Sequence, residues 1–479
     1  MELQTIQVAV FIAFTAMIAL ATYLKCRGAR TDVDSNKDYF LAGGGLSWIF
    51  VAGSITLTNM STDQLVGMNG NQMALLAWWE FAAVAGLIIL AKVFLPVYYR
   101  NNCTTTTELL EKRYNDHHIR ATVSVMFLLG NIFIFLPAML YGGSLFMQSM
   151  FGVDIPIIIL ATMFAIIGAC YAVFGGLRAV AVSDTYSGIL LLGLGMLVVF
   201  LAVQAINYDF TGIPAERLTL VGDSSSPIPW HTLLTGMIFI QVFYWSTNQT
   251  ITQRAMASPN LKEAQKGVFA AAGIRLLIVP PMIVLPGIVS YKLYGDIGDA
   301  AYGRIVSDVL PVWLSGAFAA AIAAAVLTSF NSILNSSTAL YVMDIHEKYF
   351  NEQPDVKKLS GWVTSVFVLL ALVLVPLYQQ AESIINLVQQ LYGLLSMPIL
   401  STFLVGLLFK SVDPKAMIIS VVSGTALYGV FSFVWSPFHY IHLMFITLIF
   451  CVVWALVINK LVFGNAAEFI GLKPQVAET

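Results

Sequence analysis

The sequence contains a run of polar residues inside an apolar stretch. Within residues 48–68, seven of the nine consecutive residues from Thr56 to Gln64 are polar. On a continuous membrane helix these side chains would cover every face, and some would meet lipid at a high cost. An interrupted helix avoids this cost, because its freed backbone carbonyls can line a water-filled cavity. The run therefore predicts a broken helix with an ion or solute site. A helix packed at the centre of a bundle is the alternative.

A second polar stripe lies within the apolar stretch 309–343. Thr328, Ser332, Asn335 and Ser336 recur at the spacing of one helix face. Neutral hydroxyls and carbonyls suit a weakly held monovalent cation, whereas a divalent ion prefers several carboxylates. The stripe predicts an ion-binding face. Hydroxyl groups that bond the carbonyls of their own helix are the alternative.

Single polar residues in other apolar stretches have the chemistry of a solute site. Glu80 follows two tryptophans, and Arg275 lies within the stretch 267–291. Carboxylates and amides form hydrogen bonds with hydroxyl groups, and aromatic rings cover the C–H face of a sugar-like solute. For most of these residues a helix–helix contact is the simpler explanation. A lone carboxylate in a membrane, however, needs a partner.

The elements that hold these residues are long apolar helices. Of the 479 residues, 58% are hydrophobic and only 10% are charged, whereas soluble proteins have roughly 25% charged residues. Because a membrane-spanning helix needs about 20 apolar residues, the sequence predicts an all-α polytopic membrane protein and excludes a soluble enzyme or a nucleic-acid binder. The thirteen expected spans cover roughly 6–24, 48–68, 74–99, 121–150, 155–174, 183–206, 232–250, 267–291, 309–343, 360–378, 383–410, 415–435 and 440–463.

The basic residues indicate how these spans are oriented. With the N-terminus outside, nineteen of the 24 lysines and arginines fall on the cytoplasmic side, three outside and two within spans. An excess of Lys and Arg marks cytoplasmic loops, so we expect the N-terminus outside and the C-terminus inside. Basic residues follow the first apolar stretch instead of preceding it, which indicates a retained helix and not a cleaved signal peptide. We expect a multi-pass protein of the plasma membrane, namely the inner membrane of a bacterium.

Several short motifs follow one another along the chain: Asp38–Gly44, Asn59–Gln64 with Val66–Met68, Gly175–Leu177 with Ser183–Asp184, Gln253–Arg254 with Glu263–Gly267, Leu285–Gly287, and Asn335–Ser336 with Met343–Ile345. In type and order these motifs resemble those of the sodium/solute symporter family, and closest of all its sodium/galactose (sodium/glucose) branch. The resemblance implies a LeuT-type fold, in which two five-helix repeats of inverted topology surround a midplane site. Residues 46–206 would form the first repeat and 232–410 the second, with 1–30 and 411–479 as peripheral helices of one transport domain. The spans 48–68 and 232–250 would be the paired broken helices.

The resemblance also implies which residues bind sodium. The main site would combine three backbone carbonyls and two hydroxyls, from Leu57, Met60, Ala325, Thr328 and Ser329. Thr328 stands where serine is usual, and it keeps the hydroxyl. A second sodium site would use Asp184, Asn331 and Ser332. Because Asn331 replaces an expected hydroxyl, one sodium ion is favoured over two.

The solute site follows from the same resemblance. It would be formed by Asn59, Gln64, Glu80, Gln241, Tyr244, Trp245, Arg275 and Gln389. Tyr244 resembles the inner gate that stacks on the sugar ring, and Glu80 would pair with Arg275 in the empty state. The glutamate and the glutamines favour a sugar. Gln241 and Arg275 depart from the asparagine and the nearby lysine that are usual in the galactose carriers.

Together these features predict a sodium-coupled symporter that imports a hexose-like sugar by alternating access, with sodium, a small solute and the lipid bilayer as partners. We expect a monomer or a weak oligomer. The main alternative is a symporter for a carboxylated solute, such as sialic acid, another organic acid or an amino acid, which Arg275 would serve and Glu80 would oppose. A zinc enzyme is disfavoured, because His346–Glu347 is followed by Phe350 where a second histidine would be needed. A channel would lack saturable, accumulative uptake.

Overall fold

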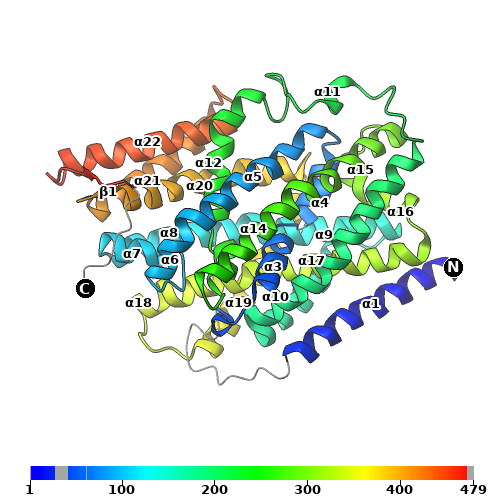
Figure 1. Ribbon diagram of the computed structural model, residues 1–479, viewed down its shortest axis with the longest axis horizontal. Helices are drawn as coiled ribbons and strands as arrows, with labels where there is room; N and C mark the ends of the chain where they lie inside the picture. Colours follow the sequence, from blue (N-terminus) through cyan, green and yellow to red (C-terminus); the bar gives the residue numbers. More distant parts are fainter. Residues whose placement is uncertain (1, 27–40, 61, 472–479) are drawn as a thin grey trace.

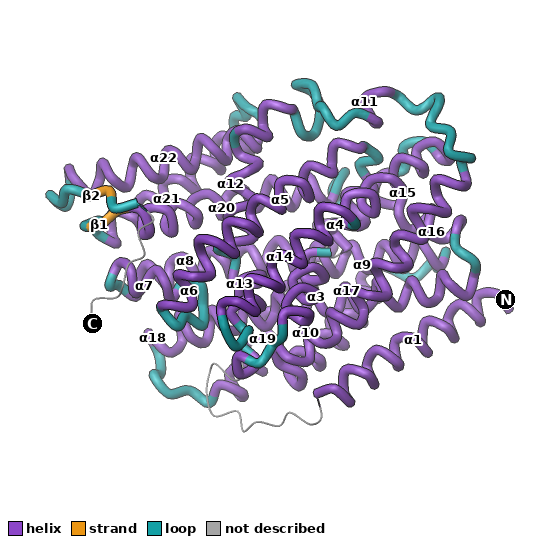
Figure 2. Tube along the Cα trace, in the orientation of Figure 1, coloured by secondary structure: helices purple, strands orange, loops and turns teal. Residues whose placement is uncertain are grey.

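The computed structural model describes residues 2–26, 41–60 and 62–471. The described residues leave out part of the first motif, Asp38–Phe40, together with Ser61 and the basic residues Arg27, Arg30 and Lys37. The side chains of Asp63 and of 170–180 are also outside the description. Most of the described chain is helical (Figure 2), and its only strands are two short ones that pair antiparallel, β1 (Phe409–Lys410) and β2 (Glu468–Phe469).

The helices follow one another with short connections. The α-helices are α1 (Glu2–Cys26), α3 (Trp48–Asn59), α4 (Thr62–Gly70), α5 (Trp78–Ile89), α6 (Leu95–Arg100), α7 (Glu108–Tyr114), α8 (His117–Gly130), α9 (Leu136–Phe151), α10 (Ile157–Ala205), α11 (Ala215–Leu218), α12 (Gly236–Ser246), α13 (Gln249–Met256), α14 (Leu261–Leu277), α15 (Val279–Tyr294), α16 (Ala301–Val309), α17 (Val312–Ala339), α18 (Glu347–Tyr349), α19 (Val356–Tyr378), α20 (Ile384–Leu408), α21 (Pro414–Gly429) and α22 (Tyr440–Leu461). The 3-10 and π-helical segments are η1 (Ala42–Gly44), η2 (Ala74–Ala77), η3 (Leu90–Phe94), η4 (Asn131–Phe135), η5 (Trp230–Leu234), η6 (Gly298–Ala300), η7 (Leu340–His346) and η8 (Val430–Val434).

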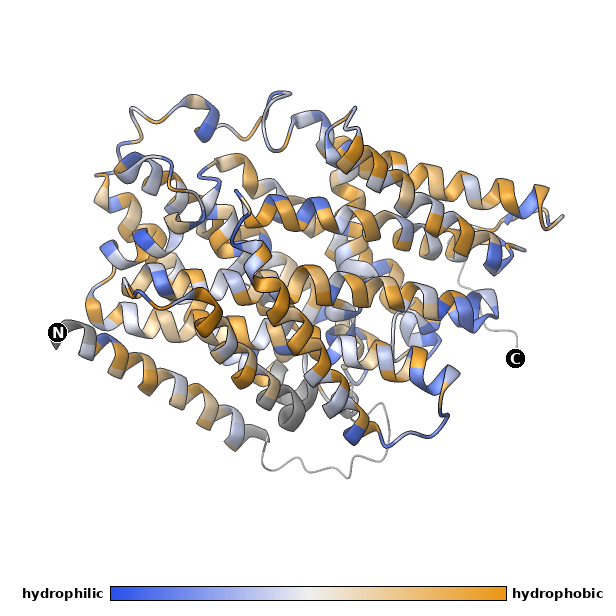
Figure 3. Ribbon diagram, turned by 180° about the vertical axis from the view of Figure 1, so that it is seen from behind, coloured by the Kyte–Doolittle hydropathy of each residue, from blue (hydrophilic) through white to orange (hydrophobic). Residues whose placement is uncertain are grey.

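The helices have the length and the composition of a membrane protein. Ten described stretches are long and apolar enough to cross a membrane, and three shorter apolar helices accompany them, Trp48–Asn59, Ile157–Ala169 and Gly236–Ser246. Each of the expected segments therefore contains an apolar helix, and the all-α membrane fold is confirmed. The count of thirteen crossings stays a prediction. Apolar residues dominate the helices, while hydrophilic residues gather at helix ends and in loops (Figure 3).

One boundary differs from expectation. We expected a break between the segments 155–174 and 183–206, but α10 is continuous over 49 residues. It does not run straight. Gly168 lies against Phe330 and Asn331, and Asp184 is hydrogen-bonded to Thr328, so both positions meet one short part of α17. In a straight helix they would be about 24 Å apart. The stretch is therefore sharply bent between these two positions.

Two helices are interrupted in the middle of the bundle. The first break lies at Met60, whose ψ of 57° ends α3 before α4 begins. The second lies between α12 and α13, where the side chain of Asn248 accepts a hydrogen bond from the amide of Thr250 at 2.9 Å and caps α13. The polar run from Thr56 to Gln64 thus marks a true helix break. α3 and α13 pack together, and both pack on α17.

The remaining helices flank this centre. α1 packs against α17 and α10 at one edge of the bundle, and α21 and α22 pack against α20 at the other (Figure 1). These are the segments that were expected to be peripheral. They leave α3, α4, α5, α12, α14, α17 and α20 to form the polar interior.

Candidate functional site

A cavity lies where the two broken helices meet α5 and α20. Seven of the eight residues expected to bind the solute line it: Asn59, Gln64, Glu80, Gln241, Tyr244, Trp245 and Gln389. The eighth, Arg275 on α14, is fully buried and contacts the cavity wall without lining the cavity. The structure therefore brings together residues that are up to 330 positions apart in the sequence, because residue 59 and residue 389 share this wall.

Glu80 is the charged centre of the wall. It lies in the first turn of α5, where the helix dipole favours a carboxylate, and only 2% of it is exposed. Its two oxygens accept hydrogen bonds from Gln64 and Arg275, and the Arg275 contact is an ion pair. Arg275 also donates to the carbonyl of Thr56 at 3.0 Å. The expected Glu80–Arg275 pair is thus present, and it also fixes the end of α3 beside the first helix break.

Two polar atoms of this cluster lack partners. Neither Oε1 of Gln64 nor Nε of Arg275 has a hydrogen-bond partner among the described residues. A buried polar atom without a partner costs about 1–3 kcal/mol. The Gln64 acceptor lies on a residue of the cavity wall, so a bound hydroxyl group or a water molecule would remove that cost.

Aromatic side chains and amides form another part of the wall. The indole N–H of Trp245 donates to Oε1 of Gln241 at 2.8 Å, and the amide of Asn59 donates to the hydroxyl of Tyr244 at 3.0 Å. The guanidinium of Arg275 lies 4.6 Å from the centre of the Trp245 ring. These contacts hold the two rings in place, so that Tyr244 joins the first helix break to the second.

Several cavity residues were not predicted. They are mostly apolar or aromatic: Met68, Trp79, Phe135, Met139, Ile240, Ile385 and Tyr392. Tyr392 was within reach of sequence reasoning, because it lies three residues after Gln389 on the same helix face. Its hydroxyl accepts a hydrogen bond from the amide of Asn248 at 2.9 Å. It thereby links α20 to the second helix break.

The residues expected to bind sodium lie one layer away, between α3 and α17. The hydroxyl of Ser329 donates to the carbonyl of Leu57 at 3.1 Å, and that of Thr328 donates to the carbonyl of Ala325 at 3.2 Å. Met60 forms the helix break itself. Four of the five expected residues are therefore joined by hydrogen bonds in two pairs, and the fifth ends the helix that carries Leu57.

The residues of the expected second sodium site are not joined to one another by any described contact. Asp184 accepts a hydrogen bond from Ser54 at 2.5 Å, and it also bonds Thr328 of the first site. The hydroxyl of Ser332 faces that of Thr58 at 3.4 Å. Neither amide atom of Asn331 has a hydrogen-bond partner among the described residues.

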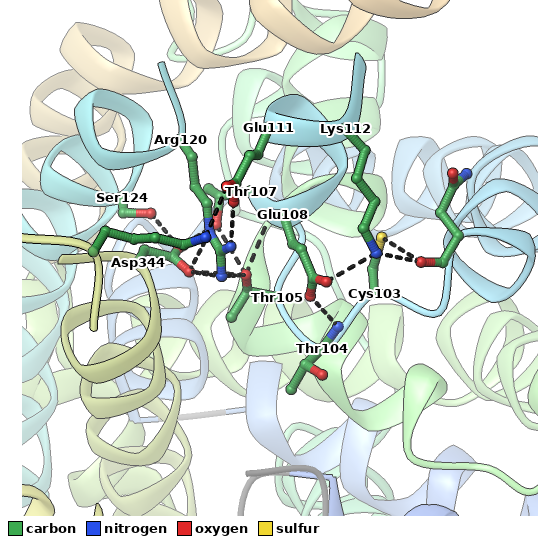
Figure 4. Close-up of polar contacts among 12 residues, drawn as sticks. Cys103, Thr104, Thr105, Thr107, Glu108, Glu111, Lys112, Arg120, Ser124 and Asp344 are labelled. Atoms are coloured by element: carbon green, nitrogen blue, oxygen red, sulfur yellow. Dashed lines mark hydrogen bonds and ion pairs between the residues drawn. The ribbon is translucent and has the colours of Figure 1, made fainter. Parts of the chain in front are cut away.

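A second buried charge cluster lies at the end of the bundle that carries α7 (Figure 4). Asp344 on η7 is fully buried and accepts hydrogen bonds from the side chains of Thr105, Thr107, Ser124 and Arg120. Arg120 also pairs with Glu111 at 2.5 Å, and Lys348 pairs with Glu111 at 2.7 Å. Burial raises the pKa of Glu111, but hydrogen bonds from Lys348 and Arg120 outweigh it and hold the pKa below its ordinary value.

This cluster is linked to the second broken helix. Gln249, the first residue of α13, accepts a hydrogen bond from the amide of Thr106 at 2.7 Å and donates to the carbonyl of Thr104 at 3.3 Å. The loop of Thr104–Thr107 therefore joins α13 to Asp344. Only a family motif had marked Asp344, because its partners lie 220 to 239 residues away in the sequence.

Two interrupted helices that meet at a polar cavity inside a membrane-spanning bundle are the architecture of a secondary transporter. The model of the sodium:solute symporter family matches residues 39–424. The chain therefore belongs to the sodium:solute symporter family. It is a multi-pass, sodium-coupled transporter of a small solute and not an enzyme.

Known relatives show how broad the similarity is. The chain is 33% identical to the uncharacterized symporter YidK of Escherichia coli (strain K12), covering 95% of this chain and 84% of that protein. It is 31% identical to the sodium/glucose cotransporter of Vibrio parahaemolyticus, and the match covers 88% of this chain and 84% of that protein. It is 27% identical to the sodium/myo-inositol cotransporter 2 of Mus musculus, and the match covers 83% of this chain and 66% of that protein.

Solved structures bear on the fold. The substrate-bound outward-open state of a Na+-coupled sialic acid symporter superposes with a TM-score of 0.83 at 18% identity, over 97% of this chain and 99% of that one. MhsT in complex with L-phenylalanine superposes with a TM-score of 0.53 at 15% identity, over 88% of this chain and 98% of that one. The expected LeuT-type fold is thus confirmed.

Proposed function

We propose that this symporter uses the sodium gradient to import a neutral, polyhydroxylated solute of hexose size. The observation that carries the proposal is the cavity wall of Glu80, Gln64, Gln241 and Gln389 next to the rings of Tyr244 and Trp245. Carboxylate and amide groups suit sugar hydroxyls, and aromatic faces suit sugar C–H groups. Relatives named for transport of glucose and of myo-inositol support this solute class.

Each wall residue has a role in this proposal. Glu80 and Gln64 bind solute hydroxyls, Gln241 and Gln389 bind further hydroxyls, and Asn59 orients Tyr244 over the ring. Arg275 acts from behind the wall, because its guanidinium neutralises Glu80 and holds the carbonyl of Thr56. A neutralised Glu80 can accept hydrogen bonds without attracting a cationic solute.

Sodium would act at the contact between α3 and α17. The carbonyls of Leu57, Met60 and Ala325 and the hydroxyls of Thr328 and Ser329 would surround the ion, which suits a monovalent cation held by neutral oxygens. Bound sodium would fasten α3 to α17 and complete the solute cavity. Its release to the cytoplasm would loosen this contact and free the solute. The moving units would be the repeats 46–206 and 232–410.

One sodium ion supplies enough driving force for accumulation. Its passage across about 100 mV contributes about 2.3 kcal/mol, and a tenfold concentration gradient adds about 1.4 kcal/mol. The sum allows about 500-fold accumulation of a neutral solute. We propose a stoichiometry of one, since Asn331 provides an amide where the second site would need a hydroxyl. In the proposed orientation the N-terminus lies outside a bacterial inner membrane.

A carboxylated solute is the competing candidate within the same class. Arg275 is the cation that would bind it. A structural relative named as a sialic acid symporter supports this candidate. Two observations favour the neutral sugar: Arg275 does not line the cavity, and its charge is already paired with Glu80. Uptake of a labelled sugar in the presence of excess neutral sugars or excess sugar acids separates the two candidates. Competition by the acids alone would overturn the proposed solute class.

The sodium site is tested by removing its two hydroxyls. In vesicles containing the purified protein, we expect the double variant Thr328→Ala, Ser329→Ala to lose sodium-dependent uptake. Ser420→Ala is the matched control, because it removes a buried hydroxyl on the peripheral helix α21. Sodium-dependent uptake that persisted in the double variant would exclude this ion site.

A further inference from the structure

Two histidines face each other where η5, the segment just before α12, meets α22. Nδ1 of His231 on η5 lies 2.5 Å from Nε2 of His442 on α22. The two rings are within 10° of parallel, and their centres are 4.6 Å apart. Because the nitrogens are much closer than the ring centres, the rings meet edge to edge. Both side chains are partly exposed, so an ion in the aqueous phase can reach them.

The hydrogen bonds around the pair allow both facing nitrogens to carry a lone pair. The hydroxyl of Thr235 donates its proton to the carbonyl of Thr232 at 3.3 Å. The same hydroxyl lies 2.8 Å from Nδ1, the other nitrogen of His442, and can accept a hydrogen bond from it. In that arrangement Nδ1 of His442 holds the proton and Nε2 is free. His231 then needs only its proton on Nε2 for the two lone pairs to converge. A hydrogen bond to the far nitrogen is the usual support of a histidine that binds a metal.

We propose that His231 and His442 form a binding site for a divalent transition metal such as Zn²⁺, with water completing the coordination. Zinc–nitrogen bonds of 2.0–2.1 Å in a tetrahedral site place the two nitrogens about 3.3 Å apart, so the pair must open by less than an ångström. No group of three or more His, Cys, Asp or Glu side chains within the described part of the chain can hold a metal. The site is therefore a two-histidine site.

A third histidine nearby is already occupied. His439 accepts a hydrogen bond from the amide of Ile441 at 3.3 Å through Nδ1, and it also bonds the backbone of Pro227. Both bonds hold the ring at the start of α22. His439 is thus a part of the surroundings and not a ligand.

The position of the pair gives the metal an effect on transport. η5 leads directly into α12, the helix that carries Gln241, Tyr244 and Trp245 of the solute cavity. α12 already packs closely on α22, since Phe239 stacks on Phe445 and the backbone of Gly236 meets that of Ile441. A metal ion between His231 and His442 ties α12 to the peripheral helix α22. Any movement of α12 during alternating access is then slowed, whatever the solute is.

The experiment titrates the purified full-length protein with Co²⁺ and follows the absorption bands of tetrahedral cobalt, then displaces cobalt with Zn²⁺. We expect saturable binding in the wild type, loss of the bands in His231→Ala and in His442→Ala, and about 10- to 100-fold weaker binding in Thr235→Val. His439→Ala and the double variant His117→Ala, His118→Ala are controls that keep the bands. Thermal unfolding of each variant establishes that it is folded. If His442→Ala does not fold, His231→Ala alone tests the site.

Zinc inhibition of sodium-driven uptake is the second readout. Each variant is compared with its own rate in a metal chelator, so an altered basal rate does not matter. We expect inhibition in the wild type and in both controls, and none in His231→Ala. The site is excluded if cobalt gives no tetrahedral bands, if His231→Ala keeps them, or if zinc inhibits this variant as it inhibits the wild type.

Discussion

The two buried ion pairs of this symporter differ in how completely they are satisfied. At the cavity, the Glu80–Arg275 pair leaves Nε of Arg275 and Oε1 of the neighbouring Gln64 without partners among the described residues. Near α7, Asp344 accepts hydrogen bonds from four side chains, and no atom of Asp344 or Arg120 is an unpartnered buried atom. The first pair has bonding capacity left for a ligand, whereas the second has none.

This difference separates a binding role from a structural one. A buried charge pair stabilises a protein only when further hydrogen bonds satisfy its remaining atoms. The Asp344 cluster meets that condition and joins α8, η7 and the loop of Thr104–Thr107. The Glu80 cluster does not meet it. We infer that its incomplete bonding is kept for the solute, so the two carboxylates should respond differently to the same chemical change.

The largest expected effect is on stability at Asp344. Asp344→Asn removes the charge and turns an N–H₂ group toward groups that donate hydrogen bonds. Breaking a buried ion pair on one side costs about 3–5 kcal/mol, so we expect a large fall in the unfolding temperature of the detergent-solubilised protein. The matched control is Glu80→Gln, the same carboxylate-to-amide change in the other pair. Equal losses of stability in the two variants would contradict the distinction.

The next effect is on solute affinity at Glu80. A hydrogen bond to a charged group contributes about 1.5–3 kcal/mol, so Glu80→Gln should weaken solute binding by roughly ten- to a hundredfold. The sodium concentration for half-maximal uptake should change much less. Solute affinity is measured by the sodium-dependent thermal shift of the protein with sugar. A sodium-dependent thermal shift with a sugar acid that is larger in Glu80→Gln than in the wild type would instead indicate an anionic solute, because the variant removes a repelling charge.

The sequence predicted the helices and the cavity wall better than it predicted the charge clusters. Hydropathy located a helix in every expected segment, and the polar run at Thr56–Gln64 located the first helix break. Polar groups in lipid-spanning segments are unusual, which made several wall residues candidates. The family resemblance then assigned the seven lining residues to the solute site. The second break, at Thr247–Asn248, was expected only from the family resemblance, since its surroundings contain aromatic residues that also suit an ordinary apolar helix.

Three-dimensional information was needed where partners are distant in the sequence. Asp344 meets Arg120 across 224 residues, and nothing in the local pattern of either residue indicates the other. The loop Thr104–Thr107 resembles an ordinary polar connection until Asp344 is placed beside it. The turn inside α10 was predicted as a break in the helix, because hydropathy detects the loss of apolar residues and not the backbone conformation that follows it.

A half-buried carboxylate, Asp299, gives the smallest and most specific effect. It accepts one hydrogen bond, from the amide of Ile384 at the start of α20 at 3.0 Å, and the described residues provide no ion pair for it. Burial raises its pKa from 3.8 to about 6, and the bond from Ile384 only partly offsets this.

The folded protein therefore binds the Asp299 proton more tightly than the unfolded chain does. By linkage, this residue makes the protein less stable as the pH rises from about 4 to about 6, and it adds no further change above that window. Asp299→Asn abolishes the titration and keeps an oxygen for the amide of Ile384. The stability of the variant relative to the wild type should then rise across the window by about 1 kcal/mol, less than the full shift implies because the carboxylate is partly exposed. Unfolding temperatures of both proteins across this pH range measure the difference. Parallel curves would mean that Asp299 is solvated in the folded state and does not belong with the two buried pairs.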